Sequence, residues 1–243
     1  MSGDAGAAGV EAPTPIHAAH ILVQRTARYV LLGEVNPSVR EMWIALHGYG
    51  QLASGFARAL APAARPGRLI VVPEALSRFY LESPVRGSHA TARVGATWMT
   101  REDRDAEIAD HVAYLDTLHD AILAQLPPVR TLVLGFSQGV ATATRWLTRG
   151  RARADHLVLW AGGLPDDVDV ARLVDPMRET RVTFVSGRQD DVVPAESIAR
   201  SASRLEALGE RYERMEFDGG HRLNRAILAR LGERSPRSNT GHE

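Results

Sequence analysis

One serine of this chain has neighbours that could make its hydroxyl group a nucleophile. Ser137 is the central residue of the pentapeptide GFSQG at residues 135–139, which follows the apolar run 131–134 and precedes a small-residue helical stretch at 140–147. This order predicts a strand, a sharp turn and a helix, with the serine hydroxyl at the apex of the turn. The glycines on either side provide the lack of bulk that so tight a turn requires.

A serine hydroxyl attacks poorly unless a base removes its proton, and an imidazole can do so near neutral pH. A carboxylate on the other ring nitrogen then fixes the tautomer and stabilises the imidazolium. Asp190 and Asp191 follow the apolar run 182–185, and His221 lies in a Gly-Gly turn after the last predicted strand. We therefore predict that Ser137 is the nucleophile and His221 the general base and acid.

The acid that orients the histidine is open between several aspartates. Either Asp190 or Asp191 could contact the imidazole, and the other would then be a solvated loop charge. Asp166 and Asp167 follow the preceding strand and are a further alternative. Asp218 can equally form the turn at its Gly-Gly bend.

Among the nine histidines, only His221 follows the last predicted strand, where its loop can reach Ser137. The alternative interpretation of His221 is a structural one, in which its side chain merely caps the following helix. Most of the others lie near a chain end, within a predicted helix, before a strand or in an undefined loop: His17, His20, His242, His111, His119, His156 and His89.

When such a serine attacks a carbonyl group, it forms a tetrahedral intermediate, and the oxyanion of this intermediate needs hydrogen-bond donors. The backbone N–H of Gln138, directly after the nucleophile, is one expected donor, and that of Tyr49, in the loop HGYG at 47–50, is the second. Because these groups belong to the main chain, the side chains there need not be catalytic. We expect His47 to be a structural hydrogen-bonding residue rather than a second base.

Short apolar runs with polar loops after them are typical of strands buried on both faces of a parallel sheet. Another strand is predicted at 212–217, and helical patterns alternate with the strands, which predicts a doubly wound α/β sheet. Ligands on such sheets bind outside the carboxyl ends of the strands, where the serine, aspartates and histidine occur. The apolar runs are 43–46, 69–72, 131–134, 157–160 and 182–185.

The clearest helix is predicted at 102–126, where apolar residues recur every three or four positions and Thr100 and Asp103 suggest a capping box. Further helices are predicted at 194–208 and 224–231. At the N-terminal end, the β-favouring runs 21–23 and 29–32 flank polar residues. They predict an antiparallel hairpin at one edge of the sheet.

The composition excludes several other kinds of function. Lys plus Arg and Asp plus Glu each number 29, so no net basic field would attract nucleic acid or an anionic membrane surface. Cysteine is absent, which removes disulfides, thiolate metal sites and a cysteine nucleophile. Lysine is absent too, which excludes a Schiff-base mechanism. A small neutral or mixed-charge substrate fits this balance.

A chain of 243 residues with 44% hydrophobic content suits one sizeable α/β core. We expect a flexible tail at 1–16, a single domain at 17–232 and a second flexible tail at 233–243. Because the first residues lack a signal-peptide pattern and no run approaches the length of a membrane span, we expect a cytoplasmic protein without stable membrane insertion. A monomer and a homodimer are both compatible with the sequence.

With these residues identified, the chain resembles the carboxylesterase/phospholipase family of α/β-hydrolases, which includes acyl-protein thioesterases. The resemblance rests on LHGYG at 46–50, GFSQG at 135–139, GRQDDVVP at 187–194 and GGH at 219–221. In that family the third stretch usually reads GxxDPxVP with the first aspartate catalytic. This implies Asp190 as the triad acid, although Asp191 replaces the proline here.

The resemblance implies an α/β-hydrolase fold with a mostly parallel sheet, an antiparallel N-terminal edge and helices on both faces. It also implies a cofactor-free serine hydrolase, and we expect cleavage of carboxylic esters with short to medium acyl groups on small soluble substrates. Thioesterase or lysophospholipase activity, and a catalytically silent binding protein, are the alternatives. The corresponding region of the family lines the acyl or alcohol pocket, so Phe79, Tyr80, Trp98 and Met99 are candidate pocket residues, although they can equally be packing residues.

Overall fold

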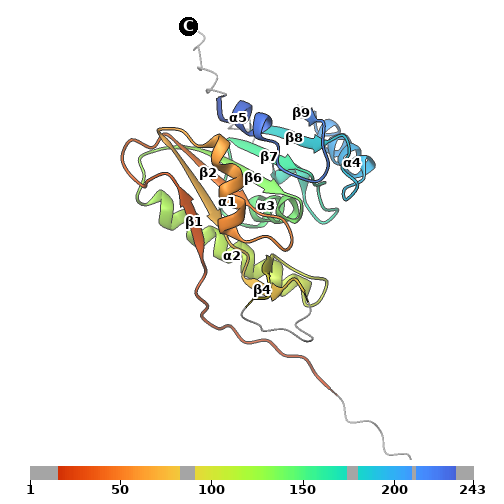
Figure 1. The fold of residues 1–243 in the computed structure, drawn as a ribbon. Coiled ribbons are helices and arrows are strands. Elements are labelled where there is room, and N and C mark those ends of the chain that lie inside the picture. Colours follow the sequence, from red (N-terminus) through yellow and green to blue (C-terminus); the bar gives the residue numbers. More distant parts are fainter. Residues whose placement is uncertain (1–15, 83–90, 174–179, 210–211, 234–243) are drawn as a thin grey trace, which may run out of the picture.

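A seven-stranded sheet forms the centre of the molecule, with strands in the order β1-β3-β2-β6-β7-β8-β9 (Figure 1). The computed structural model describes residues 16–82, 91–173, 180–209 and 212–233. Only the pairing of β1 with β3 is antiparallel in this sheet, and β4 and β5 form a separate antiparallel pair. The strands are β1 (Tyr29–Leu32), β2 (Glu41–Leu46), β3 (Arg68–Pro73), β4 (Ser77–Tyr80), β5 (Val94–Thr97), β6 (Arg130–Phe136), β7 (His156–Trp160), β8 (Arg181–Gly187) and β9 (Tyr212–Phe217).

Helices cover both faces of the large sheet, because successive residues of each strand point to opposite sides. Along β2, Ile44 and Leu46 pack with residues of α2, α3 and α4, whereas Trp43 and Ala45 pack with residues of α1 and α5. The predicted fold class is therefore confirmed. The helices are α1 (Ala53–Leu60), α2 (Arg104–Leu123), α3 (Gln138–Arg149), α4 (Ala195–Glu206) and α5 (Arg225–Glu233), with short 3-10 turns at Ala61–Ala63 and Val170–Arg172.

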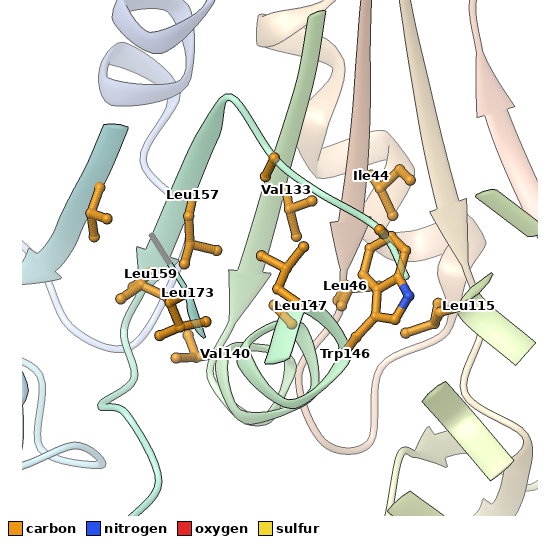
Figure 2. Close-up of a cluster of buried hydrophobic side chains, with 14 of the residues drawn as sticks. Ile44, Leu46, Leu115, Val133, Val140, Trp146, Leu147, Leu157, Leu159 and Leu173 are labelled. Atoms are coloured by element: carbon orange, nitrogen blue, oxygen red, sulfur yellow. The ribbon is translucent and has the colours of Figure 1, made fainter. Parts of the chain in front are cut away.

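Helix α3 is anchored under the middle of the sheet by large apolar side chains. Figure 2 shows Trp146 and Leu147 of this helix beside Val133 of β6 and Ile44 of β2. The Trp146 indole is fully buried and its N–H donates to the Asp116 carboxylate of α2 over 2.9 Å. Truncating a buried tryptophan typically costs about 3–5 kcal/mol. These contacts fix the position of α3 against the sheet, and they thereby fix the serine at the start of the helix.

The N-terminal edge differs from the predicted hairpin. β1 (Tyr29–Leu32) is an antiparallel edge strand as expected, but it pairs with β3, and residues 21–23 are exposed and outside any strand. The connecting residues Gln24, Arg25 and Thr26 lack the Gly, Asn or Asp that a tight hairpin turn requires. Residues 16–28 therefore extend away from the sheet instead of folding back on it.

The start of α2 also differs from its prediction. The helix begins at Arg104 and ends at Leu123, and Asp103 has a left-handed backbone with φ 47° and makes no side-chain cap bond. The Asp103 carboxylate contacts His20 over 2.9 Å, and the Thr100 N–H donates to Glu107. The predicted capping box is therefore wrong, because its carboxylate is engaged by the N-terminal segment.

The connection between β3 and α2 contains structure that the sequence pattern did not indicate. β4 and β5 pair from Ser77 with Thr97 to Tyr80 with Val94. Gly95 and Ala96 at the centre of β5 conceal its strand character, since both residue types are depleted in strands. The remaining predicted strands and helices are present, with ends shifted by a few residues.

The predicted terminal tails at 1–16 and 233–243 lie almost wholly outside the described residues. Within the described ranges, no helix combines the length and the apolar character needed to cross a membrane.

Candidate active site

Ser137 occupies a strained turn between β6 and α3. Its backbone has φ 54° and ψ −118°, and its N–H donates to the Trp160 carbonyl over 2.9 Å. A β carbon on Gly135 would lie 2.6 Å from the Val140 Cα, and one on Gly139 would collide with the Leu46 carbonyl. Only glycine fits these two positions, so the spacing of the GFSQG pentapeptide is a steric requirement of the turn. Strain of this kind typically costs about 1–3 kcal/mol and is common at functional sites.

The structure brings together the serine, histidine and aspartate that the sequence singled out. His221 Nε2 lies 2.8 Å from Ser137 Oγ. His221 Nδ1 lies 2.9 and 3.1 Å from the two carboxylate oxygens of Asp190. The three residues follow the carboxyl ends of β6, β8 and β9, and the Phe136 ring packs against the imidazole with 5.1 Å between centroids. Such an arrangement can transfer the serine proton to an imidazole whose tautomer is fixed by a carboxylate.

The Asp190 carboxylate is buried and well supplied with donors. Its side chain is 5% exposed, and Oδ1 accepts hydrogen bonds from the N–H groups of Val192 and Val193, each over 3.0 Å. Burial alone would raise the pKa of this carboxyl group, but the bonds from His221 and from the two N–H groups outweigh it and lower the pKa. The carboxylate form is therefore favoured at neutral pH.

The other aspartates considered from the sequence lie elsewhere. Asp191 and Asp166 are exposed. Both oxygens of Asp167 accept from the Arg145 guanidinium, over 2.8 and 3.0 Å. Asp218 is paired with an arginine of the preceding loop, Arg188, over 2.8 Å. Asp190 is thus the carboxylate that contacts the imidazole.

The loops that carry Asp190 and His221 are joined to each other through their backbones. The Arg188 N–H donates to the Phe217 carbonyl over 2.9 Å, and the Gln189 N–H donates to the Gly219 carbonyl over 3.0 Å. A β carbon on Gly187 would collide with the same Gly219 carbonyl. The close approach fixes the separation of the two side chains.

The loop after β2 runs directly against the serine. A β carbon on Gly48 would lie 3.2 Å from the Ser137 Cβ, and the Gly48 N–H donates to the Gln51 side chain over 2.8 Å. Tyr49 is the next residue of this loop. The N–H of Gln138 is the first of α3, and donors at a helix start have no partner within the helix. Both predicted oxyanion donors therefore belong to segments beside Ser137.

His47 is fully buried behind this loop. Its Nδ1 lies 2.8 Å from the Gly48 carbonyl, and its Nε2 accepts from the Ala75 N–H over 3.1 Å. Burial lowers the pKa of the imidazole, so the ring is neutral, with the proton on Nδ1. These contacts are those of a residue that fixes the loop.

The four candidate pocket residues occupy different environments. Phe79 stacks on Tyr49 with 5.1 Å between ring centroids, and Tyr80 is exposed. Trp98 is 3% exposed, and its indole N–H donates to the His47 carbonyl over 2.9 Å, so it supports the loop from behind. The Met99 sulfur lies 3.2 Å from an Arg145 nitrogen. Phe79 and Trp98 thus both contact the 47–50 loop, through Tyr49 and His47 respectively.

Two features near the serine were not found from the sequence. The Gln51 side chain and the Gln138 side chain both bond to backbone groups of neighbouring segments, and a polar loop residue has no sequence signal for such a role. Among the described residues, no group of three or more His, Asp or Glu side chains is arranged to hold a metal ion.

The fold and the geometry around Ser137 define an α/β-hydrolase. The family model described as serine hydrolase (FSH1) matches residues 41–225, and the chain therefore belongs to the serine hydrolase (FSH1) family. The predicted class of enzyme is confirmed. A comparison with curated proteins gives no match.

Solved structures of similar fold include three α/β-hydrolases. Acyl-protein thioesterase 2 of Zea mays is 22% identical, with a TM-score of 0.61 over 86% of this chain and 97% of that one. A Bacillus cereus carboxylesterase is 14% identical, with a TM-score of 0.61 over 85% and 92%. A phospholipase/carboxylesterase of Dyadobacter fermentans is 16% identical, with a TM-score of 0.59 over 86% and 96%. At such identities the likeness shows the fold.

Proposed function

We propose that this serine hydrolase cleaves carboxylic esters through an acyl-Ser137 intermediate. The observation that carries the proposal is the 2.8 Å contact between Ser137 Oγ and His221 Nε2, with the opposite ring nitrogen on the Asp190 carboxylate. In this proposal Ser137 is the nucleophile, His221 the general base and acid, and Asp190 the residue that orients the imidazole. The backbone N–H groups of Tyr49 and Gln138 are the oxyanion donors.

The reaction begins when His221 takes the proton of the Ser137 hydroxyl and Oγ forms a bond to the ester carbonyl carbon. The carbonyl electron pair moves to the oxygen, and the two backbone N–H groups stabilise the resulting oxyanion. When the intermediate collapses, the bond to the alcohol oxygen breaks and His221 gives its proton to that oxygen. A water molecule, deprotonated by His221, then attacks the acyl carbon to form a second tetrahedral intermediate. When this intermediate collapses, the bond to Oγ breaks and His221 returns the proton to Oγ, which releases the acid and the free serine.

Exposed apolar side chains in the loop beside the serine, in the loop that carries Asp190 and at the end of β4 support an acyl group as the substrate. Tyr49 and Val192 are 60% and 61% exposed, and Tyr80 and Leu81 are partly exposed. Tyr49 belongs to the loop against Ser137, and Val192 is two residues after Asp190. Such side chains can bury part of a short or medium acyl chain, at about 0.8 kcal/mol for each methylene group removed from water.

A thioester is the second candidate substrate class, because the same steps cleave a thioester and a neighbour of similar fold is an acyl-protein thioesterase. A lysophospholipid would require a longer apolar surface for its acyl chain. A protein that binds esters without cleaving them is the third alternative, and it would keep the ligand while showing no turnover.

The test is turnover of p-nitrophenyl acetate, butyrate, octanoate and decanoate by the wild type and by Ser137→Ala. We expect the wild type to prefer the shorter chains and Ser137→Ala to lose activity on all of them. Matched oxygen esters and thioesters of the preferred acyl group then decide between the first two candidates. Full activity of Ser137→Ala, or ligand-induced thermal stabilisation of the wild type without turnover, would contradict the proposal.

A further inference from the structure

The side-chain amide of Gln138 is held from both ends by one short segment. Its oxygen accepts from the Trp98 N–H over 3.1 Å, and the Thr97 hydroxyl beside it donates to the Met99 carbonyl over 2.9 Å. Its nitrogen donates to the Met99 carbonyl over 2.8 Å and to the Thr97 hydroxyl oxygen over 2.9 Å. Because a backbone N–H can only donate and a carbonyl can only accept, Trp98 and Met99 fix which end of the amide is which.

The same segment also holds the loop after β2. The Gly50 N–H donates to the Ala96 carbonyl over 2.9 Å, and the Ala96 N–H donates to the Gln51 carbonyl over 3.2 Å. A β carbon on Gly95 would lie 2.7 Å from the Gly50 Cα, so the two backbones are in close contact. β5 and the residues after it therefore contact both segments that carry the proposed oxyanion donors.

The position of these donors needs support of this kind. Gln138 follows a serine with φ 54° and begins α3, so its N–H is not held by a bond of the regular helix. Loss of one oxyanion donor costs roughly 10²- to 10³-fold in turnover, and a displacement of about 1 Å can cost roughly 10²-fold. A side chain that fixes residue 138 against β5 therefore acts on the rate through its own backbone N–H.

We propose that the Gln138 side chain, together with the Thr97 hydroxyl, positions the oxyanion hole by tying the start of α3 to the strand that also holds the Tyr49 loop. Gln138 and Thr97 are positioning residues for the reaction, since their side chains act through backbone groups. This inference rests on the proposed ester hydrolysis, and it deepens that proposal.

Two variants of Gln138 separate positioning from bulk. Gln138→Glu keeps the size and the acceptor for Trp98 but sets a carboxylate oxygen against the Met99 carbonyl. Gln138→Met keeps most of the volume and removes every hydrogen bond. For both we expect kcat to fall about 10- to 100-fold while KM changes by less than about threefold, because the donors act mainly in the transition state. Affinity for a trifluoromethyl ketone, whose adduct with serine carries an oxyanion, should fall by the same factor as kcat/KM.

Thr97 provides a milder test in case the Gln138 variants fold poorly. Thr97→Val removes the hydroxyl at nearly constant shape, and Thr97→Ser retains it. We expect a fall of kcat of about threefold to tenfold in Thr97→Val and recovery in Thr97→Ser, on the scale of one lost neutral hydrogen bond. Gln125→Ala is the control, since that exposed amide, two residues after the end of α2, also bonds to a backbone carbonyl, that of Ala121. It should leave kcat unchanged.

The decisive comparison is kcat, KM, inhibitor affinity and melting temperature for these variants against the wild type. Parallel losses in kcat and in trifluoromethyl ketone affinity, with KM retained, support positioning. Wild-type kcat in Gln138→Met or in Thr97→Val, or a loss explained wholly by a lower fraction of folded enzyme, overturns it. Failure of the proposed function itself would be distinguishable, because the wild type and the Gln125 control would then show no ester turnover.

Discussion

The two sides of the site are built by different means. Around Ser137, backbones approach so closely that β carbons on Gly135, Gly139 or Gly95 would collide with their neighbours. On the other side, one close approach of Gly187 to the Gly219 carbonyl joins the two loops, and hydrogen bonds of the side chains then orient His221 and Asp190, while other loop residues such as Val192 are exposed. We infer that close packing of glycines determines the turn that carries Ser137, whereas polar contacts orient the imidazole. Substitutions of these glycines should therefore affect folding, and substitutions of Asp190 or His221 should affect turnover.

The largest expected effect is on the side of the polar contacts. Asp190→Asn removes the charge that stabilises the imidazolium and favours the wrong tautomer, so kcat should fall about 10³- to 10⁴-fold. Asp191→Asn, one residue away and exposed, should retain activity within about twofold, since surface substitutions have small effects. Kinetics of p-nitrophenyl acetate hydrolysis by both variants checks this. A collapse of kcat in Asp191→Asn alone would assign the acid to the other residue.

On the side built by shape, Gly135→Ala should unfold the turn. Its β carbon would lie 2.6 Å from backbone atoms of Gly139 and Val140, and we expect a loss of about 3 kcal/mol or more in the free energy of unfolding. Gly55→Ala in α1 is the matched control, because the nearest atom to its β carbon is a flexible arginine nitrogen 3.9 Å away. That change should stabilise the helix by about 0.5–1 kcal/mol. Urea denaturation measures both, and equal stability of the two variants would remove the steric argument.

Acid should also weaken the fold as a whole, through the buried His111 of α2. Burial, with a smaller effect from Arg145 and Arg149, lowers the pKa of His111 to about 4. The unfolded chain therefore binds this proton near pH 6.5, whereas the folded chain does not until about pH 4. Stability is thus fully present above pH 6.5 and falls as the pH drops toward 4, by at most about 3 kcal/mol for this residue.

His111→Leu should flatten that dependence. Burial outweighs the opposing effect of the Trp98 and Glu107 backbones on the His111 pKa, and within the described part of the chain neither ring nitrogen makes a hydrogen bond of good geometry. An apolar residue of similar volume should therefore be tolerated. The free energy of unfolding should still fall somewhat with pH in this variant, because burial also lowers the pKa of His47 and His119. Urea denaturation of both proteins at several pH values between 7 and 4 gives the result. An unchanged slope in His111→Leu would exclude His111 as a source of the acid sensitivity.

The smallest expected effect concerns an exposed apolar residue in the loop that carries Asp190. Val192→Ser should raise KM for p-nitrophenyl octanoate about twofold to fivefold and leave KM for the acetate unchanged, because only the longer chain reaches this side chain. Leu208→Ser, an exposed apolar change after α4, is the control and should alter neither value. If KM for both esters rises equally in Val192→Ser, the acyl chain does not lie against this residue.

The contrast between the two sides also explains what the sequence could predict. Gly135, Ser137 and Gly139 form a short local pattern, and steric exclusion makes that pattern nearly sufficient to identify the turn. Buried strands were equally clear, because burial on both faces requires continuous apolar runs. For these reasons the fold class and the residues that meet at the site could be predicted from the sequence.

Contacts between residues that are distant in the sequence could not be predicted from it. Residue type and position alone left Asp190 and Asp191 open, and Asp190 was preferred only through the resemblance to a family motif; the contact of its carboxylate with His221 depends on the folded loop. The capping interpretation of Asp103 failed because His20, far away in the sequence, engages that carboxylate. The centre of β5 consists of Gly95 and Ala96, and its strand character comes from its pairing with β4. The hydrogen bond of Gln138 to Thr97 of this strand therefore had no local signal.

The most direct test of the central claim is the rate at which a fluorophosphonate probe modifies the protein, with the modified residue located by peptide mass analysis. A serine activated by His221 and Asp190 should give one adduct, on Ser137. Its rate of formation should fall at least about 10³-fold in His221→Ala, whereas Asp191→Asn should react like the wild type. An adduct on another residue, or equal labelling of the wild type and His221→Ala, would contradict the account.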